Sequence, residues 1–132
     1  MLNLNIPKID TALAEEGAWV EFQPGISFLI RRERTPQYVS AIQAIHKRHK
    51  RQLDAGTASN EVIDAAMAEA QARHILVGWS GLTEGDDHKS LPYSVDAALA
   101  ILRDPAYQEL RDWVMEQSRD VENYRGQQLK ER

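Results

Sequence analysis

Two short runs of alternating residues around one proline–glycine pair restrict most strongly how this chain can fold. In residues 18–22 small or apolar side chains alternate with Trp19 and Glu21, and residues 26–31 alternate in a similar way, as half-buried strands do. Pro24-Gly25 between them favours a type II turn, because proline pre-sets φ at its second position and glycine accepts the positive φ of its third. The sequence therefore predicts a β-hairpin over residues 18–32. An isolated hairpin is only marginally stable in water, so this one must pack on the rest of the chain.

The rest of the chain has helical periodicity. Four helices are predicted, over residues 36–53, 60–78, 94–103 and 106–128, each preceded by a capping residue or a proline typical of a helix start. The last of them carries an apolar stripe at steps of three and four, too short for a confident coiled coil. The expected fold class is α+β, mainly α, with an N-terminal hairpin packed on a bundle of about four helices in one domain, residues 1–132.

Composition narrows the class of protein. The 132 residues are 42% hydrophobic and include no cysteine, which allows a real core and excludes disulfides and thiol catalysis. No run approaches the roughly 18 apolar residues of a membrane span, and no secretory signal is recognisable. The net charge of −4 makes nucleic acid an unlikely partner. We expect no membrane association and a cytoplasmic location.

Candidate catalytic and metal-binding residues do not form a recognised motif. His46 and His49 are three apart, whereas the zinc-protease helix needs a spacing of four with a glutamate, and their neighbours are cationic. Ser80 is one position out of register for a nucleophile elbow, and the acidic loop at 84–88 lacks the order of a calcium loop. His74 falls on an apolar helix face and is expected to be a hydrogen-bonded core histidine. We expect no enzyme activity, no cofactor and no metal.

The basic run "HKRHKR" is the strongest charge feature of the chain. Lys47, Arg48, Lys50 and Arg51 place four positive charges within residues 46–51, with no interleaved aromatic residues for base stacking. Three interpretations are open: a solvated helix face, a binding site for an acidic protein partner, and a nucleic-acid contact.

The segment "HILVGWSGL" (residues 74–82) carries a tryptophan where a helix is expected to end. Trp79 can cap the core, with Gly78 or Gly81 ending the helix in a left-handed conformation. Alternatively, Trp79, Leu82 and Tyr93 can form an exposed patch for a partner helix, since aromatic residues concentrate in binding hot spots. Both interpretations remain open at this point.

The order of these features resembles a known family. "EGAWVEF" opens the hairpin, "RRERTPQY" leads into a helix, and an alanine-rich helix runs into "HILVGWSGL". A polar turn and "LPYSVDAALAILRDPAYQELRDWVMEQSRDVENYR" follow. Over about residues 14–126 this is similar to the tail assembly chaperones of long-tailed bacteriophages and related prophages.

The resemblance implies a small non-enzymatic protein of the host bacterial cytoplasm. Such chaperones bind and solubilise the tape measure protein, help to recruit tail tube protein around it, and are absent from the mature virion. Many are also made in a longer, frameshifted form. The alternative is a structural virion component such as a tail-completion or connector protein, and a nucleic-acid-binding regulator is a more distant alternative. Self-association is also expected, because coating a long protein takes many copies.

Overall fold

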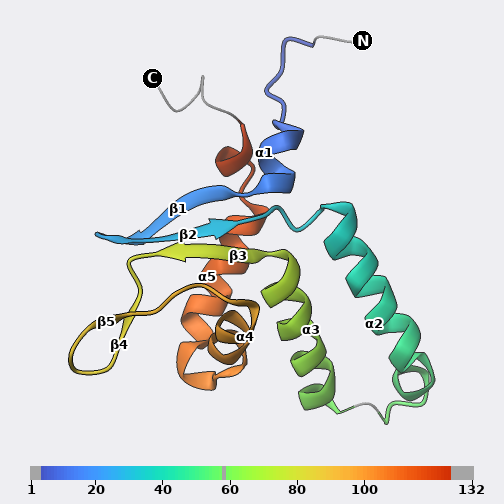
Figure 1. The fold of residues 1–132 in the computed structure, drawn as a ribbon. Helices are drawn as coiled ribbons and strands as arrows, with labels where there is room; N and C mark the ends of the chain where they lie inside the picture. Colours follow the sequence, from blue (N-terminus) through green and yellow to red (C-terminus); the bar gives the residue numbers. More distant parts are fainter. Residues whose placement is uncertain (1–3, 58, 126–132) are drawn as a thin grey trace.

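The computed structural model describes residues 4–57 and 59–125. Its elements follow the order α1 (Thr11–Glu16), β1 (Ala18–Gln23), β2 (Ile26–Ile30), α2 (Pro36–Asp54), α3 (Asn60–His74), β3 (Leu76–Ser80), β4 (Thr83–Glu84), β5 (Lys89–Ser90), α4 (Val95–Arg103), the 3₁₀ turn η1 (Pro105–Tyr107), α5 (Gln108–Arg119) and the 3₁₀ turn η2 (Val121–Tyr124). The expected α+β class is confirmed. Helix α5 packs against β2, and α3 lies between α2 and α4 (Figure 1).

The predicted hairpin is confirmed. Strands β1 and β2 pair antiparallel with Ala18 opposite Ile30 and Val20 opposite Phe28. Gly25 turns the chain with a φ of 85°, a value that glycine adopts without the steric cost that a side chain brings. Alternation then sets the two faces of the hairpin. Phe28 and Ile30 are buried in the core, whereas Trp19 is 54% exposed.

The predicted helix over 60–78 is wrong in its last turn. Helix α3 ends at His74, and Leu76–Ser80 forms strand β3, which pairs antiparallel with β2 in a three-stranded sheet of order β1-β2-β3. Ile75 is the cap residue in between, and its carbonyl accepts a hydrogen bond from the Arg31 amide at 2.9 Å. The physical reason is that β2 had one unpaired edge, and β3 satisfies its backbone donors and acceptors.

The predicted helix over 106–128 is also interrupted. Helix α5 covers only Gln108–Arg119, and the extended Asp120 separates it from η2, whose first turn Asp120 caps by accepting from the Glu122 amide at 3.0 Å. Residues 126–128 lie outside the described residues. Helices α2 and α4 confirm the predictions to within one residue. Helix α1 and the small β4–β5 hairpin in the loop after β3 were not predicted.

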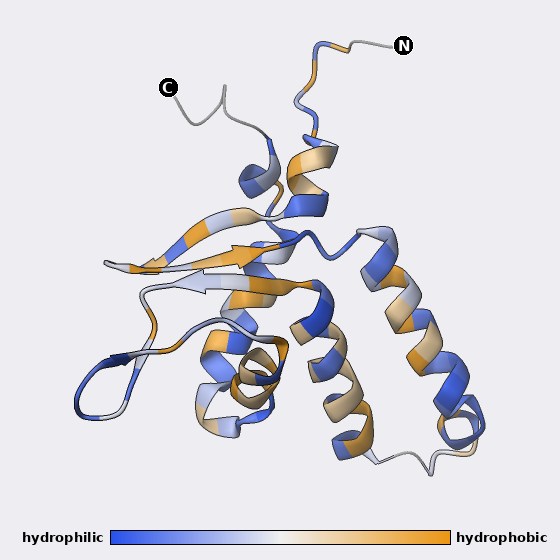
Figure 2. Ribbon diagram, in the orientation of Figure 1, coloured by the Kyte–Doolittle hydropathy of each residue, from blue (hydrophilic) through white to orange (hydrophobic). Residues whose placement is uncertain are grey.

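Two groups of buried side chains hold these elements together. The larger group joins the sheet to the helices α2–α5 through Phe28, Ile45, Leu76 and Val114, among others. Figure 2 shows hydrophobic segments on the strands and on these helices. The smaller comprises Ala14, Ala18 and the fully buried Tyr124. The N-terminal helix and the C-terminal turn are therefore anchored to one another at the same end of the sheet.

The close approach of two turns gives a test of the sheet. Gly81 follows β3 with a φ of 89°, and a Cβ there would lie 1.8 Å from the carbonyl oxygen of Gly25. Gly56 has a similar φ of 70° but open space around it. We expect Gly81→Ala to lower the free energy of unfolding by clearly more than Gly56→Ala, whose cost should be the roughly 1–2 kcal/mol of backbone strain alone. Urea denaturation of the two variants measures this difference, and equal losses would contradict the packing of β3 beside the hairpin turn.

Candidate functional site

The structure brings Trp79, Tyr93 and Leu82 together, but inside the protein. Trp79 is 8% exposed and belongs to the core, and Leu82 and Tyr93 pack partly buried against that core. The Trp79 and Tyr93 rings meet edge to face with centroids 4.9 Å apart, a favoured aromatic geometry. Of the two interpretations of Trp79, the structure therefore supports the core residue. Gly78 and Gly81 do not end a helix, since both lie in or after β3.

Both aromatic side chains also tie strand β3 to the chain that precedes α4. The Trp79 Nε1 donates a hydrogen bond to the carbonyl of Leu91 at 2.8 Å, and the Tyr93 hydroxyl donates to the carbonyl of Leu76 at 2.8 Å. Burial raises the pKa of Tyr93 above the usual tyrosine value, so the hydroxyl stays protonated and keeps donating. Each of the two aromatic rings therefore fills part of the core with its apolar body and satisfies a backbone carbonyl with its polar group.

The basic run lies on the outer, C-terminal part of α2. Lys47, Arg48, Lys50 and Arg51 are all exposed and border an open depression of about 740 Å³. None of the four forms an ion pair with another described residue. His46 is exposed as well, and His49 Nδ1 lies 3.2 Å from Gln52 Oε1 on the same helix. The structure thus gathers four unpaired cations on one helix end of the described chain.

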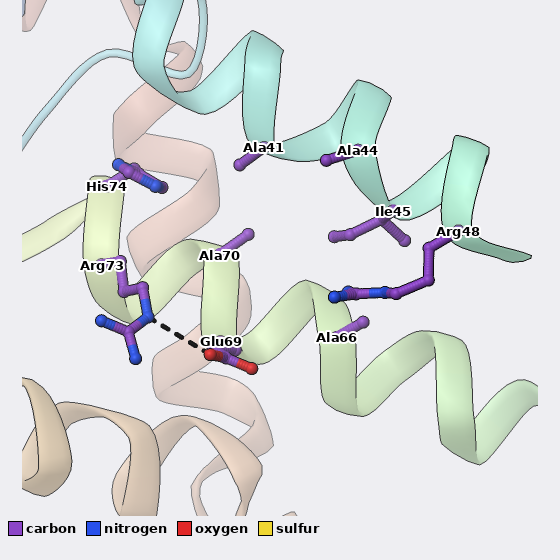
Figure 3. Close-up of a pocket in the computed structure, with 9 residues that line it drawn as sticks. All are labelled: Ala41, Ala44, Ile45, Arg48, Ala66, Glu69, Ala70, Arg73 and His74. Atoms are coloured by element: carbon purple, nitrogen blue, oxygen red, sulfur yellow. Dashed lines mark hydrogen bonds and ion pairs between the residues drawn. The ribbon is translucent and has the colours of Figure 1, made fainter.

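A groove runs between α2 and α3 (Figure 3). Its volume is about 170 Å³. Small and apolar side chains form its floor: Ala41, Ala44, Ile45, Ala66 and Ala70. Charged or polar side chains lie along its edges: Arg48 on α2, and Glu69, Arg73 and His74 on α3. Arg73 and Glu69 form an exposed ion pair at 3.3 Å, which leaves Arg48 as the cation at the groove without such a partner among the described residues.

His74 is not the buried core histidine that the sequence predicted. It is partly exposed and lines the groove. Burial, helped by the positive charges of Arg31 and Arg73, lowers the pKa of His74 below the usual histidine value. The imidazole is therefore mostly neutral at neutral pH and adds no positive charge to the groove.

The sequence did not predict a buried polar cluster around Arg111 in the first turn of α5. Arg111 is 6% exposed; its Nε donates to Gln71 Oε1 at 2.8 Å and its Nη1 to Asp64 Oδ2 at 3.0 Å. Tyr38 on α2 is buried in the same core, and burial raises the pKa of its hydroxyl. The hydrogen bonds of Arg111 link α5 to α3 and therefore stabilise the fold. An arginine four residues from Met115 and three from Val114, both buried, was the available signal.

Residues 4–57 and 59–125 contain no candidate metal centre, because no group of three or more histidine or carboxylate side chains there is placed to hold a metal ion. No helix in these ranges is long and apolar enough to cross a membrane. The groove combines an apolar floor with Arg48 at its edge, and the basic helix end beside it adds three further cations.

The fold and these surfaces define a small α+β protein with a helical pair beside an antiparallel sheet. Among known families, the one described as YdaY prophage protein matches residues 33–132. This range includes all elements from α2 onward. The chain therefore belongs to this prophage protein family. No curated protein and no solved structure gives a significant match.

A paired substitution tests the role assigned to Trp79. We expect Trp79→Ala to lower the free energy of unfolding by about 3–5 kcal/mol, because it removes a buried ring and leaves a cavity. Trp19→Ala is the control, since its ring is 54% exposed on β1, and it should cost well under half as much. Chemical denaturation followed by circular dichroism gives both values. A Trp79→Ala variant as stable as the wild type would contradict the core assignment.

Proposed function

We propose that this prophage protein is a tail assembly chaperone. It binds and solubilises the tape measure protein in the host cytoplasm, helps to recruit tail tube protein, and acts as a stoichiometric, non-enzymatic partner that is absent from the mature virion. Two findings support the proposal: membership of a prophage family over residues 33–132, and the motif order that resembles the chaperones of long-tailed phages.

The observation that carries the proposal is the groove between α2 and α3. Its alanine-rich floor lets another backbone approach closely, and its volume of about 170 Å³ lies open at the surface between two helices. An amphipathic helix binds such a groove with its apolar face. The tape measure protein of long-tailed phages is largely helical, so a helical segment of it is the occupant that we propose.

Charge indicates which helix fits. Arg48 stands at the groove edge, and Lys47, Lys50 and Arg51 follow beside it without ion-pair partners among the described residues. A bound helix with acidic side chains flanking its apolar face would neutralise them and would gain orientation and association rate from the complementary field. The exposed Val62 lies one helical turn before Ala66 on the same face of α3 and adds apolar area next to the groove.

Co-expression with the tape measure protein of the same prophage tests the proposal. Wild-type protein should keep most of the tape measure protein in the soluble fraction. Ala44→Glu should lower the affinity at least about tenfold and leave most of the tape measure protein insoluble, because it puts a bulky charged side chain where the apolar face of the bound helix would pack and occupies Arg48. The substitution should leave the fold intact, since Ala44 is exposed and a glutamate at this position would lie one helical turn before Arg48, a stabilising spacing.

Ala100→Glu is the matched control, because it makes the same change at an exposed position of α4, away from the groove. It should solubilise the tape measure protein as the wild type does. Equal solubilisation by Ala44→Glu would contradict the groove as the binding site. Mass spectrometry of purified virions addresses the alternative: many copies per particle would reject the chaperone and identify a structural virion component.

A further inference from the structure

We propose that the outer face of the sheet binds a second copy of this chain and forms a two-fold symmetric dimer. The outer face is the side of the sheet turned away from α5, and strand pairing places these residues on it: Trp19 and Glu21 on β1, Ser27 and Leu29 on β2 with Arg31 just after it, and Gly78 and Ser80 on β3. None of them lines the groove between α2 and α3, so the proposal goes beyond the proposed function and does not rest on it.

Alternation along β2 separates the outer face from the core. Phe28 points to the inner face, where it shares the core with Val114 of α5. Leu29 follows Phe28 in the strand and therefore points to the outer face. It lies opposite Trp19 on β1 and opposite Gly78 on β3. The three strands therefore carry one apolar row, Trp19–Leu29–Gly78, across the face that α5 does not cover.

The apolar row is open to a partner. Trp19 is the most exposed aromatic side chain of the described chain, at 54%, and Leu29 is partly exposed. A Cβ added at Gly17 or at Gly78 would lie 3.1 Å from the Leu29 side chain, so Leu29 covers two positions that have no side chain of their own. The row is therefore low and flat around Leu29, with the Trp19 ring beside it. Tryptophan is enriched among the residues that dominate binding energies.

Opposite charges lie at the two ends of this row. Glu21 is on the side nearest the hairpin turn, and Arg31 is on the other side, where its Cγ lies 3.5 Å from the position of an added Gly17 Cβ. Neither charge forms an ion pair with another residue of ranges 4–57 and 59–125. The Arg31 Nε donates a hydrogen bond to the Glu15 carbonyl. Its terminal nitrogens remain able to bind a carboxylate in a forked geometry.

This order of charges fits a second copy of the same face. A two-fold axis in the plane of contact and perpendicular to the strands reverses the strand direction of the second copy. Glu21 of each copy then meets Arg31 of the other, and the Trp19 rings of both copies pack at the centre. A closed dimer needs such a self-complementary surface, and sheets packed about 10 Å apart leave both charged side chains within reach. A partner of one charge sign would satisfy only one of the two ends.

The size of the outer face indicates how strong the dimer is. Three strands of about five residues span roughly 14 by 17 Å. This contact is well below the roughly 800 Å² per partner of a standard stable interface. We therefore expect a weak, reversible dimer with a Kd on the order of 100 µM.

Sedimentation equilibrium of the full chain over roughly 10 µM to 1 mM, a range that brackets this Kd, tests the dimer. Trp19→Ala should weaken dimerisation at least about tenfold, because it removes both central rings. Tyr107→Ala is the matched control, since it truncates another exposed aromatic side chain, on η1 beside α4 and α5, and it should dimerise as the wild type does. Both side chains are exposed, so both variants should keep the wild-type circular dichroism spectrum.

Charge reversal tests the two-fold arrangement. Glu21→Arg and Arg31→Glu should each weaken the dimer at least about tenfold, because each places like charges opposite one another. An equimolar mixture of these two variants should dimerise as tightly as the wild type, since every contact then regains one charge of each sign. The proposal is overturned if the wild type is monomeric at about 1 mM, if Trp19→Ala dimerises as tightly as Tyr107→Ala, or if the mixture dimerises no more tightly than either folded variant alone.

Discussion

The rest of the structure depends on the pairing of β2 with β3. A two-stranded hairpin alone leaves two open edges and one uncovered apolar face, and it is marginal in water. Strand β3 satisfies the second edge of β2, and it is covalently joined to α3. Through this one pairing β2 becomes the central strand of a three-stranded sheet that the helices can cover. Gly81 allows the turn after β3 to pack closely against the hairpin turn at Gly25.

Side-chain hydrogen bonds to backbone carbonyls then fix the helices on this sheet. The Tyr124 hydroxyl donates to the Ile30 carbonyl and the Ser118 hydroxyl to the Arg31 carbonyl, both at 2.9 Å, so the C-terminal part of the chain is tied to the end of β2. Helix α2, by contrast, packs mainly on α3 at the periphery (Figure 1). Its position leaves a groove on one side and a free, basic end, and these are the surfaces on which the proposed function rests.

Local signals were sufficient for much of this fold, whereas partners far apart in the sequence decided the rest. The Pro24-Gly25 turn and the caps of α2 and α4 depend on neighbouring residues, and they were predicted. The run Ile75-Leu76-Val77 fits a helix or a buried strand equally well, and only the free edge of β2 selects the strand. Arg111 is buried because Asp64 and Gln71 on another helix receive its hydrogen bonds. The candidate site followed the same pattern: its cations were predicted, whereas the groove needed the packing of two helices.

NMR of the segment 74–80 tests the central claim, the strand β3 and its pairing with β2, most directly. The structure places Phe28 opposite Trp79 and Ser27 opposite Ser80. We therefore predict cross-strand nuclear Overhauser effects between these pairs and extended-chain couplings over Leu76–Ser80. A continuous series of strong sequential amide–amide contacts from His74 through Gly78, without cross-strand contacts, would show a helix there and would contradict the account.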